Sequence, residues 1–287
     1  MMREILLHAH GKINLTLDVL YRRPDGYHAI RSIMQSVGLA DQVCIGRRSI
    51  EGVRVHCTPS FGPPEENLAW KAAAAFGAAA GISVGVDIVV EKQIPAAAGL
   101  AGGSADAAAV LYALQLLYPG RLLEAELRAV ALSVGADVPF CMQGGTILAE
   151  GIGEQLTPLP YQGDWKVVIV KPPESVATKT VYENLDRAWF GDRYTGRFLA
   201  AARQKGSLCC LGNIMESYTA SVIPSVNVWK RRLAETGACI AQMSGSGPSV
   251  FGLFRAEIDA LAFLSKYSQE VDCFMTAFSE RGISEVE

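Results

Sequence analysis

Residues 94–106 read Ile-Pro-Ala-Ala-Ala-Gly-Leu-Ala-Gly-Gly-Ser-Ala-Asp, and the rest of the chain is arranged around this run. A strand-like segment, Val84–Glu91, precedes it, with Val84, Val86, Ile88 and Val90 on one face, and a segment of helical composition, Ser104–Tyr118, follows it. Glycine lets a backbone approach a ligand closely, and the first N–H groups of a helix suit phosphate oxygens. Ser104 is the expected N-cap, with a hydroxyl that could instead face a phosphate or a metal ion. The run therefore indicates a phosphate-binding loop, although a tight turn with close helix–strand packing would use the same residues.

The composition is that of an ordinary globular protein and excludes several classes of function. The chain has 287 residues and a formal net charge of -3, so no broad basic surface for nucleic acid is expected. No apolar run reaches the length of about 18 residues that a membrane span needs, and residues 1–12 hold too short an apolar run for a signal peptide. The seven cysteines form no Cys-x-x-Cys pair, which predicts reduced thiols in the cytoplasm and no zinc site.

A regular alternation predicts a strand over residues 12–19. Ile13 and the odd-numbered residues after it are apolar, whereas Lys12 and Asn14 lie side by side on the opposite face. Lysine and asparagine are depleted in strands, so their joint presence marks this face as a candidate site. A solvated strand face is the alternative interpretation.

Three shorter motifs add candidate ligand-binding groups. Residues 24–26, Pro-Asp-Gly, predict a turn, and Tyr27 and His28 directly after it offer a ring and an imidazole to a flat polar ligand such as a base. Asp137 follows a helix stop and precedes a Val-Pro pair, so it is either a helix cap or a carboxylate held in a cleft. Residues 244–249, Ser-Gly-Ser-Gly-Pro-Ser, predict a tight turn between two strands whose amides and hydroxyls could bind an anion.

The segment 151–164, rich in Gly and Pro, is the expected boundary between two domains. Before it, Asn67 and Gly81 are the expected cap and stop of an alanine-rich helix. Beyond it we expect a strand over 166–171, a helix that starts at Thr178 and carries Tyr182, a helical segment over 208–222, and a poorly ordered tail over 279–287.

Three stretches, in order along the chain, resemble those of the GHMP kinase superfamily, which includes galactokinase, homoserine kinase and mevalonate kinase. They are Gly-Lys-Ile-Asn-Leu at 11–15, the alanine- and glycine-rich run at 95–109, and Ser-Gly-Ser-Gly-Pro-Ser at 244–249. Three further stretches resemble one branch of the superfamily: Arg-Pro-Asp-Gly-Tyr-His at 23–28, Gly-Ala-Asp-Val-Pro-Phe at 135–140, and Gly-Gly-Thr at 144–146 with Gly-Ile-Gly-Glu at 151–154. The motif at 23–28 is the most specific of them. It is similar to a branch of the superfamily whose substrate carries a cytidine diphosphate group.

The resemblance implies an α+β, two-domain GHMP kinase fold. Residues 1–157 would form the ATP-binding N-terminal domain, with a left-handed β-α-β element. Residues 158–287 would form the substrate-side C-terminal domain, an α/β sandwich. Because crossovers are right-handed as a rule, the left-handed element rests on the resemblance alone. The active site would lie between the two domains.

The resemblance also implies the reaction. Enzymes of this branch transfer the γ-phosphate of ATP to the 2-hydroxyl of a methylerythritol moiety, a step in the non-mevalonate biosynthesis of isoprenoid precursors. Mg²⁺ is expected, because phosphoryl transfer depends on positioning and charge neutralisation. The expected partner is thus a small molecule with a cytidine diphosphate group, with no nucleic acid and no membrane, and no oligomeric state follows from the sequence.

By similarity, the catalytic residues are Asp137, which would accept the proton of the substrate hydroxyl, and Lys12, which would stabilise charge on the transferring group. The ATP-binding residues would be Pro95, Ala96, Ala97, Ala98, Gly99, Leu100, Ala101, Gly102, Gly103, Ser104 and Ala105. The substrate-binding residues would be Asn14, Tyr27, His28, Tyr182, Gly245, Ser246 and Gly247. Among these, the two tyrosines and the histidine would hold the cytosine by stacking and hydrogen bonds.

Two positions depart from the family's usual pattern. His10 and Gly11 stand where the family usually has Pro-Ala, and a glycine there is expected to loosen the approach to Lys12. Ala105 stands where a second serine usually follows Ser104, which removes a hydroxyl near the phosphates but keeps the backbone N–H.

Two alternative functions remain open at this point. A kinase for another small alcohol, such as mevalonate or homoserine, would have no base to stack on Tyr27 and Tyr182. A non-catalytic nucleotide-binding sensor would have no need of Lys12 and Asp137, and both are present. A comparison of turnover between the cytidine compound and the other alcohols tests the first alternative. ATP binding without turnover of any of them would support the second.

Overall fold

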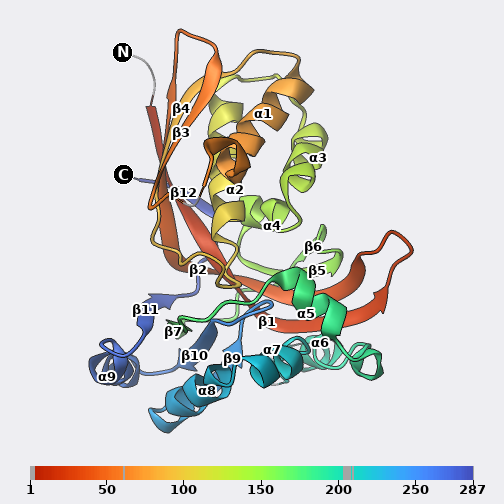
Figure 1. The fold of residues 1–287 in the computed structure, drawn as a ribbon, viewed down its shortest axis with the longest axis vertical. Coiled ribbons are helices and arrows are strands. Elements are labelled where there is room, and N and C mark those ends of the chain that lie inside the picture. Colours follow the sequence, from red (N-terminus) through yellow and green to blue (C-terminus); the bar gives the residue numbers. More distant parts are fainter. Residues whose placement is uncertain (1–3, 61, 203–207, 209, 287) are drawn as a thin grey trace.

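The structure is a computed structural model that describes residues 4–60, 62–202, 208 and 210–286. It has two lobes, and the long strands β1 and β2 run through the first lobe and on along the second (Figure 1). The first sheet contains β1 (Glu4–Arg22), β2 (His28–Arg47), β3 (Gly52–Thr58), β4 (Gly85–Glu91), β5 (Thr146–Gly151), β6 (Gln155–Pro158), β8 (Gly212–Asn213) and β12 (Ile283–Glu285). Its main path is β12-β1-β2-β4-β3, with β5 beside β2, β6 beside β5, and β8 beside β1.

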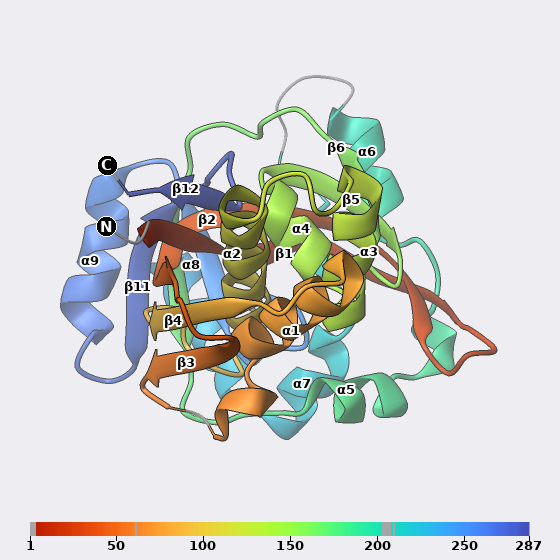
Figure 2. The same cartoon turned by 90° about the horizontal axis from the view of Figure 1, so that it is seen from above.

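Helices cover one face of this sheet in the first lobe. They are the 3-10 turn η1 (Pro64–Glu66), α1 (Leu68–Ala80), α2 (Gly102–Leu117), α3 (Glu124–Val134) and α4 (Val138–Gln143). Figure 2 shows α2 in the middle of the lobe, across β1 and β2. Its alanines let it approach the sheet closely, and Val110, Leu111 and Leu114 are fully buried. Each of these three side chains contributes about 1.5–3 kcal/mol of hydrophobic stabilisation.

The β-α-β element is formed by β3, α1 and β4, because β3 and β4 are parallel neighbours and α1 connects them. As predicted, the side chain of Asn67 caps α1 by accepting the N–H of Ala69, and Gly81 ends the helix in the left-handed region at φ 63°. The buried face of β4 is also as predicted, with Val86, Ile88 and Val90 inaccessible to solvent.

The second lobe is built on the four-stranded antiparallel sheet β11-β7-β10-β9. Its strands are β7 (Lys166–Lys171), β9 (Ile240–Met243), β10 (Val250–Phe254) and β11 (Asp272–Ala277). Its helices are α5 (Thr178–Asn184), the 3-10 turn η2 (Arg187–Trp189), α6 (Thr195–Ala202), α7 (Glu216–Val222), α8 (Ser225–Glu235) and α9 (Glu257–Tyr267). Gln242 on β9 donates to the backbone oxygens of Asn14 and Leu15, so this sheet is fastened to β1.

One alternative is excluded and three expectations from the sequence need correction. The solvated face considered for residues 12–19 is not observed, because Lys12 is buried against Gly99 and Asp137 of the first lobe and Asn14 against Ser244 of the second. Helix α2 begins at Gly102 with Ala101 at the N-cap position, so Ser104 is inside the first turn. Residues 208–222 are helical only from Glu216, and residue 209 lies outside the described part. The tail forms β12 up to Glu285, and residue 287 lies outside the described part.

The division at residues 157 and 158 stays a proposal. The first half of the chain contributes strands β1 to β6 to the sheet of the first lobe. Strands β8 and β12 of the same sheet come from the second half of the chain. The two lobes are therefore joined by strand pairing as well as by the connecting segment. Within the part of the chain that the structure describes, we found no helix that could span a membrane.

Candidate active site

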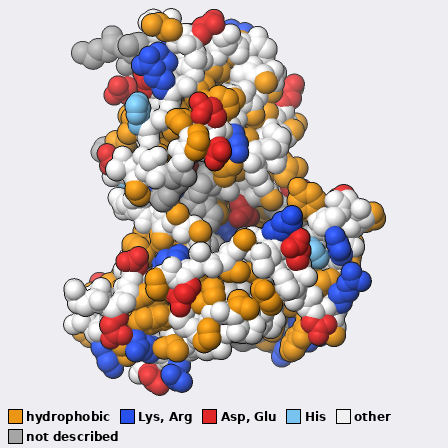
Figure 3. All heavy atoms as spheres, viewed as in Figure 1, with side chains coloured by type: hydrophobic (Ala, Val, Ile, Leu, Met, Phe, Trp, Pro, Cys, Tyr) orange, Lys and Arg blue, Asp and Glu red, His pale blue; other side chains and the backbone are white. Residues whose placement is uncertain are grey.

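A cleft of about 1440 Å³ lies between the two lobes. The space-filling view shows it as a hollow that contains charged side chains of both signs (Figure 3). Most of the predicted site residues line it: Lys12, Asn14, Tyr27, His28, residues 95–104, Asp137, Tyr182, Gly245 and Ser246. Two do not. Ala105 is fully buried within α2, and Gly247 packs on Met243 and Thr219 behind the cleft.

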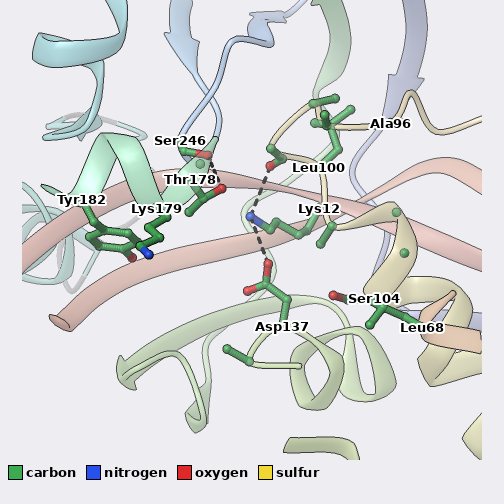
Figure 4. A pocket seen from close by; sticks show the side chains of 18 of the residues that line it. Lys12, Leu68, Ala96, Leu100, Ser104, Asp137, Thr178, Lys179, Tyr182 and Ser246 are labelled. Carbon is green, nitrogen blue, oxygen red and sulfur yellow. Dashed lines mark hydrogen bonds and ion pairs between the residues drawn. The ribbon is translucent and has the colours of Figure 1, made fainter. Parts of the chain in front are cut away.

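Lys12 is held at the centre of the cleft by groups from three parts of the chain (Figure 4). Its Nζ donates to Asn14 Oδ1 at 2.8 Å and to the backbone oxygen of Gly99 at 3.2 Å, and it lies 3.7 Å from Asp137 Oδ2. The lysine side chain is only 5% exposed, whereas the Asp137 side chain is 33% exposed. The lysine is therefore fixed, and the carboxylate opposite it is open to a ligand.

Asn14 uses its side chain to hold Lys12 in place. Its Oδ1 accepts from Lys12, and its Nδ2 donates to Ser32 Oγ at 2.9 Å. The side chain is buried. Its first role in this structure is thus to orient the lysine, and contact with substrate stays a prediction.

The two glycine-rich loops touch each other through their backbones. A Cβ on Gly99 would lie 2.3 Å from the backbone oxygen of Ser244, and a Cβ on Gly245 would lie 3.1 Å from the backbone oxygen of Gly99. Ser244 Oγ donates to that same oxygen of Gly99 at 3.0 Å. The turn at 244–249 therefore supports the phosphate-loop candidate and, through it, Lys12.

The residues before α2 adopt the backbone expected of an anion-binding loop. Ala97, Gly99 and Ala101 all have positive φ, at 50°, 73° and 58°. Lys12 N donates to Leu100 O at 3.0 Å, which ties the loop to β1. The N-terminus of α2 faces the cleft with Gly102 and Gly103, where its free amides and helix dipole favour phosphate oxygens.

The departure at residues 10 and 11 has a structural explanation. Gly11 is closely packed rather than loose, since a Cβ there would lie 3.3 Å from both Ile94 Cδ1 and the Leu100 oxygen. His10 Nδ1 contacts the Val37 oxygen at 3.2 Å, and its Nε2 contacts Ser284 Oγ at 3.0 Å. His10 thus anchors β12, and the expectation that Gly11 loosens the approach to Lys12 is wrong.

Aromatic rings form the wall of the cleft at its second-lobe end. The His28 ring stacks on the Tyr182 ring at 4.9 Å and 14°, and Phe190 meets His28 edge-on at 5.8 Å. Tyr27 is 61% exposed beside them. Burial, with the positive charges of Arg22 and Arg187, lowers the pKa of His28, so the imidazole is neutral near pH 7 and can both donate and accept a hydrogen bond. The wall suits a flat polar ring.

Sequence reasoning missed several residues of the cleft. Phe190 carried no local signal, because an aromatic residue before a Gly-Asp pair is common in loops. Lys92 lies in the cleft between two buried carboxylates, contacting Asp41 and, at 2.6 Å, Asp106 Oδ2. Burial raises the pKa of Asp106 to about 7. A Lys-Gln-Ile-Pro segment next to the glycine-rich run was the available signal for Lys92.

The fold and the cleft define a small-molecule kinase of the GHMP class. The family model described as GHMP kinases N terminal domain matches residues 67–145. The model described as GHMP kinases C terminal matches residues 195–272. Beyond that class, the chain belongs to the family of 4-diphosphocytidyl-2-C-methyl-D-erythritol kinases. A relative of that name from Acetivibrio thermocellus is 44% identical over 96% of this chain and 99% of its own length. One from Geobacter metallireducens is 43% identical over 96% of this chain and 98% of its own length.

Solved structures agree with this assignment. A crystal structure of 4-(cytidine 5'-diphospho)-2C-methyl-D-erythritol kinase matches with a TM-score of 0.82 and 34% identity, covering 96% of this chain and 99% of that one. Homoserine kinase from Cytophaga hutchinsonii matches with a TM-score of 0.79 at 20% identity, over 100% and 98% of the two chains. The second likeness shows the fold alone.

Proposed function

We propose that this chain is an ATP-dependent kinase that phosphorylates the 2-hydroxyl of 4-diphosphocytidyl-2-C-methyl-D-erythritol in non-mevalonate isoprenoid precursor biosynthesis. The observation that carries the proposal is the Lys12–Asp137 pair, which stands where the phosphate-loop candidate and the aromatic wall meet. Relatives with this name at 44% and 43% identity support it. The pair supplies a base and a cation at one point of the cleft.

In this proposal Asp137 accepts the proton of the substrate hydroxyl as that oxygen attacks the γ-phosphorus. General-base assistance of this kind contributes about 10²–10⁴-fold to the rate. Lys12, fixed by Asn14 and Gly99, holds positive charge beside the transferring group. Two of its three N–H groups donate to Asn14 and Gly99, and its 3.7 Å separation from Asp137 is longer than a hydrogen bond, so the third N–H can donate to a phosphoryl oxygen.

The residues fit a magnesium ion bound mainly by the nucleotide. Among the described residues no group of three His, Cys, Asp or Glu side chains could hold a metal ion by itself. Mg²⁺ keeps several waters and needs only one or two protein oxygens beside the phosphates, and the open carboxylate of Asp137 and the hydroxyl of Ser104 line the same cleft. When bound, the ion would neutralise charge on the phosphates.

The aromatic wall would hold the cytosine. Tyr27 offers an exposed ring face, and neutral His28 offers one donor and one acceptor to the base. His28 is stacked on Tyr182 here, so a base that stacks on Tyr182 from the same side would take the place of the imidazole.

A coupled ADP-release assay with ATP and Mg²⁺ tests the proposal. It compares 4-diphosphocytidyl-2-C-methyl-D-erythritol with mevalonate and homoserine, and the Asp137→Asn variant prepared in parallel controls for contaminating kinases. We expect turnover of the cytidine compound alone, lost in the variant. Turnover of another alcohol instead would refute the substrate, and ATP binding without any turnover would indicate a nucleotide sensor.

A further inference from the structure

Strand β1 carries two further polar side chains beyond Lys12 and Asn14, Thr16 and Asp18, and both are fully buried. A register shift between Asn14 and Thr16 separates them from the alternation of residues 12–14. A buried carboxylate is costly unless it is hydrogen-bonded. Asp18 lies away from the reacting groups and lines no part of the cleft, so the mechanism above leaves it without a role.

Asp18 binds three consecutive backbone N–H groups at the start of α6. Its Oδ1 accepts from Arg193 N at 3.1 Å and Tyr194 N at 3.2 Å, and its Oδ2 accepts from Thr195 N at 2.7 Å. Such charge-assisted bonds are stronger than neutral ones. A residue of β1 thus fixes the position of a segment that is 175 residues away in sequence.

Neighbouring contacts fasten the same segment to both long strands. Arg31 Nη1 on β2 pairs with Asp192 Oδ2 at 2.5 Å, and Thr195 Oγ1 donates to the backbone oxygen of Arg31 at 3.0 Å. Gly191 N donates to the Val19 oxygen at 2.9 Å. Residues 191–196 are therefore held along β1 and β2 by bonds from several independent groups.

Residues 191–196 are connected to the aromatic wall in two ways. Phe190, the residue before Gly191, places its ring edge-on against His28. The backbone N–H of Arg193 donates to Asp18. Its guanidinium lies against η2 and donates to the backbone oxygens of Ala188 and Trp189 at 2.8 Å each. A shift of residues 191–196 would therefore move both η2 and Phe190.

We infer that Asp18 and Asp192 are positioning residues for the substrate's base. They pin residues 191–196 to β1 and β2 and so hold Phe190 and η2 as the rigid side of the base-binding wall. The inference rests on the proposed function for the identity of the base. The inference predicts that the two aspartates affect binding of the cytidine substrate but not of ATP, because neither residue touches the phosphate loop or the Lys12–Asp137 pair.

The test measures steady-state kinetics of Asp18→Asn and Asp192→Asn in the full-length protein. We expect Asp18→Asn to raise KM for the cytidine substrate about tenfold, the change that corresponds to part of one charge-assisted hydrogen bond. KM for ATP and kcat should stay within about twofold, because the reacting groups do not move. Asp192→Asn keeps the acceptor for Gly196 N and should show a smaller rise.

Glu270→Gln is the matched control, since Glu270 Oε2 pairs with Arg232 Nη1 at 2.6 Å between the turn that follows α9 and α8, outside the cleft. It should change neither KM. Calorimetric binding of cytidine 5'-diphosphate to each variant gives a readout without turnover, and thermal melts confirm that each variant is folded.

The outcomes separate this inference from the proposed function. If folded Asp18→Asn binds cytidine 5'-diphosphate as tightly as the wild type, or if KM for ATP rises equally, the inference is overturned while the kinase assignment stands. If the wild type does not turn over the cytidine substrate, the proposed function fails, and a selective loss of cytidine 5'-diphosphate binding in Asp18→Asn still supports the positioning role. A wild type that binds no cytidine 5'-diphosphate overturns both.

Discussion

The backbone contact between the two glycine-rich loops allows a sharp test at Gly99. Two neighbours, Ala97 and Ala101, already have positive φ, so a side chain in the left-handed region is tolerated in this loop. What excludes a side chain at Gly99 is the backbone oxygen of Ser244, which a Cβ would approach to 2.3 Å. Gly99→Ala therefore measures the loop contact rather than backbone strain alone.

The size of the effect follows from this distance. Ordinary contact begins near 3.4 Å, so the loops would have to separate by about 1 Å. The backbone oxygen of Gly99 accepts from both Lys12 Nζ and Ser244 Oγ. Separation of the two loops therefore displaces the Lys12 ammonium from its position. A misplacement of about 1 Å at reacting groups costs about 10²-fold in rate. We expect kcat/KM to fall by about that factor.

The assay is ADP release from the wild type, Gly99→Ala and a matched control, Gly120→Ala. Gly120 has φ 71°, close to the 73° of Gly99, but a Cβ there meets nothing within 4 Å. Both variants carry the left-handed cost of about 1–2 kcal/mol in stability. If Gly99→Ala and Gly120→Ala lose activity equally, or if Gly99→Ala keeps full activity, the loop contact does not position Lys12.

Three further predictions concern other parts of the cleft. Asp137→Asn should lower kcat by about 10²–10⁴-fold while ATP still binds in a calorimetric titration, and near-normal turnover would exclude the carboxylate as base. Tyr27→Ala should weaken substrate binding by about 1–3 kcal/mol if the ring stacks on the base, and an unchanged dissociation constant would contradict stacking. Burial raises the pKa of Asp106 to about 7, so the folded state holds a proton that the unfolded state releases from about pH 4 upward, and wild-type stability should fall as pH rises toward 7. Asp106→Asn should lack this component, so parallel slopes of Tm against pH for the two proteins would refute it.

The sequence predicted the local elements well where each depends on neighbouring residues. Asn67 and Gly81 bound α1 as their capping chemistry requires, and the apolar alternation of β4 gave its buried face. The alternation of residues 12–19 identified β1 as a strand, but not the register shifts at 10–12, 14–16 and 19–21 that interrupt its pairing with β2. The partners of its polar residues lie far along the chain, at Gly99 and Asp137 for Lys12, at Arg193 for Asp18 and at Ser244 for Asn14, and no pattern within β1 could reveal them. That is why the solvated-face alternative for Lys12 could not be dismissed from the sequence.

The remaining errors have the same physical origin. The N-cap rule placed the cap of α2 at Ser104, but the observed N-cap is Ala101, in the left-handed region, three residues earlier. The polar composition of residues 279–287 suggested a free tail, yet β12 pairs with β1 and His10 bonds to Ser284. At the tail, pairing with the distant strand β1 outweighed the local preference, and at α2 the loop before the helix is tied to β1 by the bond from Lys12 N to the Leu100 oxygen.

Ala105 shows how little the departures from the family's pattern bear on the reaction. The side chain is fully buried within α2 and lines no part of the cleft, while its N–H bonds within the first turn to the Ala101 oxygen at 2.9 Å. A hydroxyl at this position would need a buried partner of its own, since an unpaired one costs free energy. In the proposed mechanism, contact with phosphate falls to the residues before it, which line the cleft. Lys12 and Asp137, the proposed catalytic groups, are in place independently of both departures.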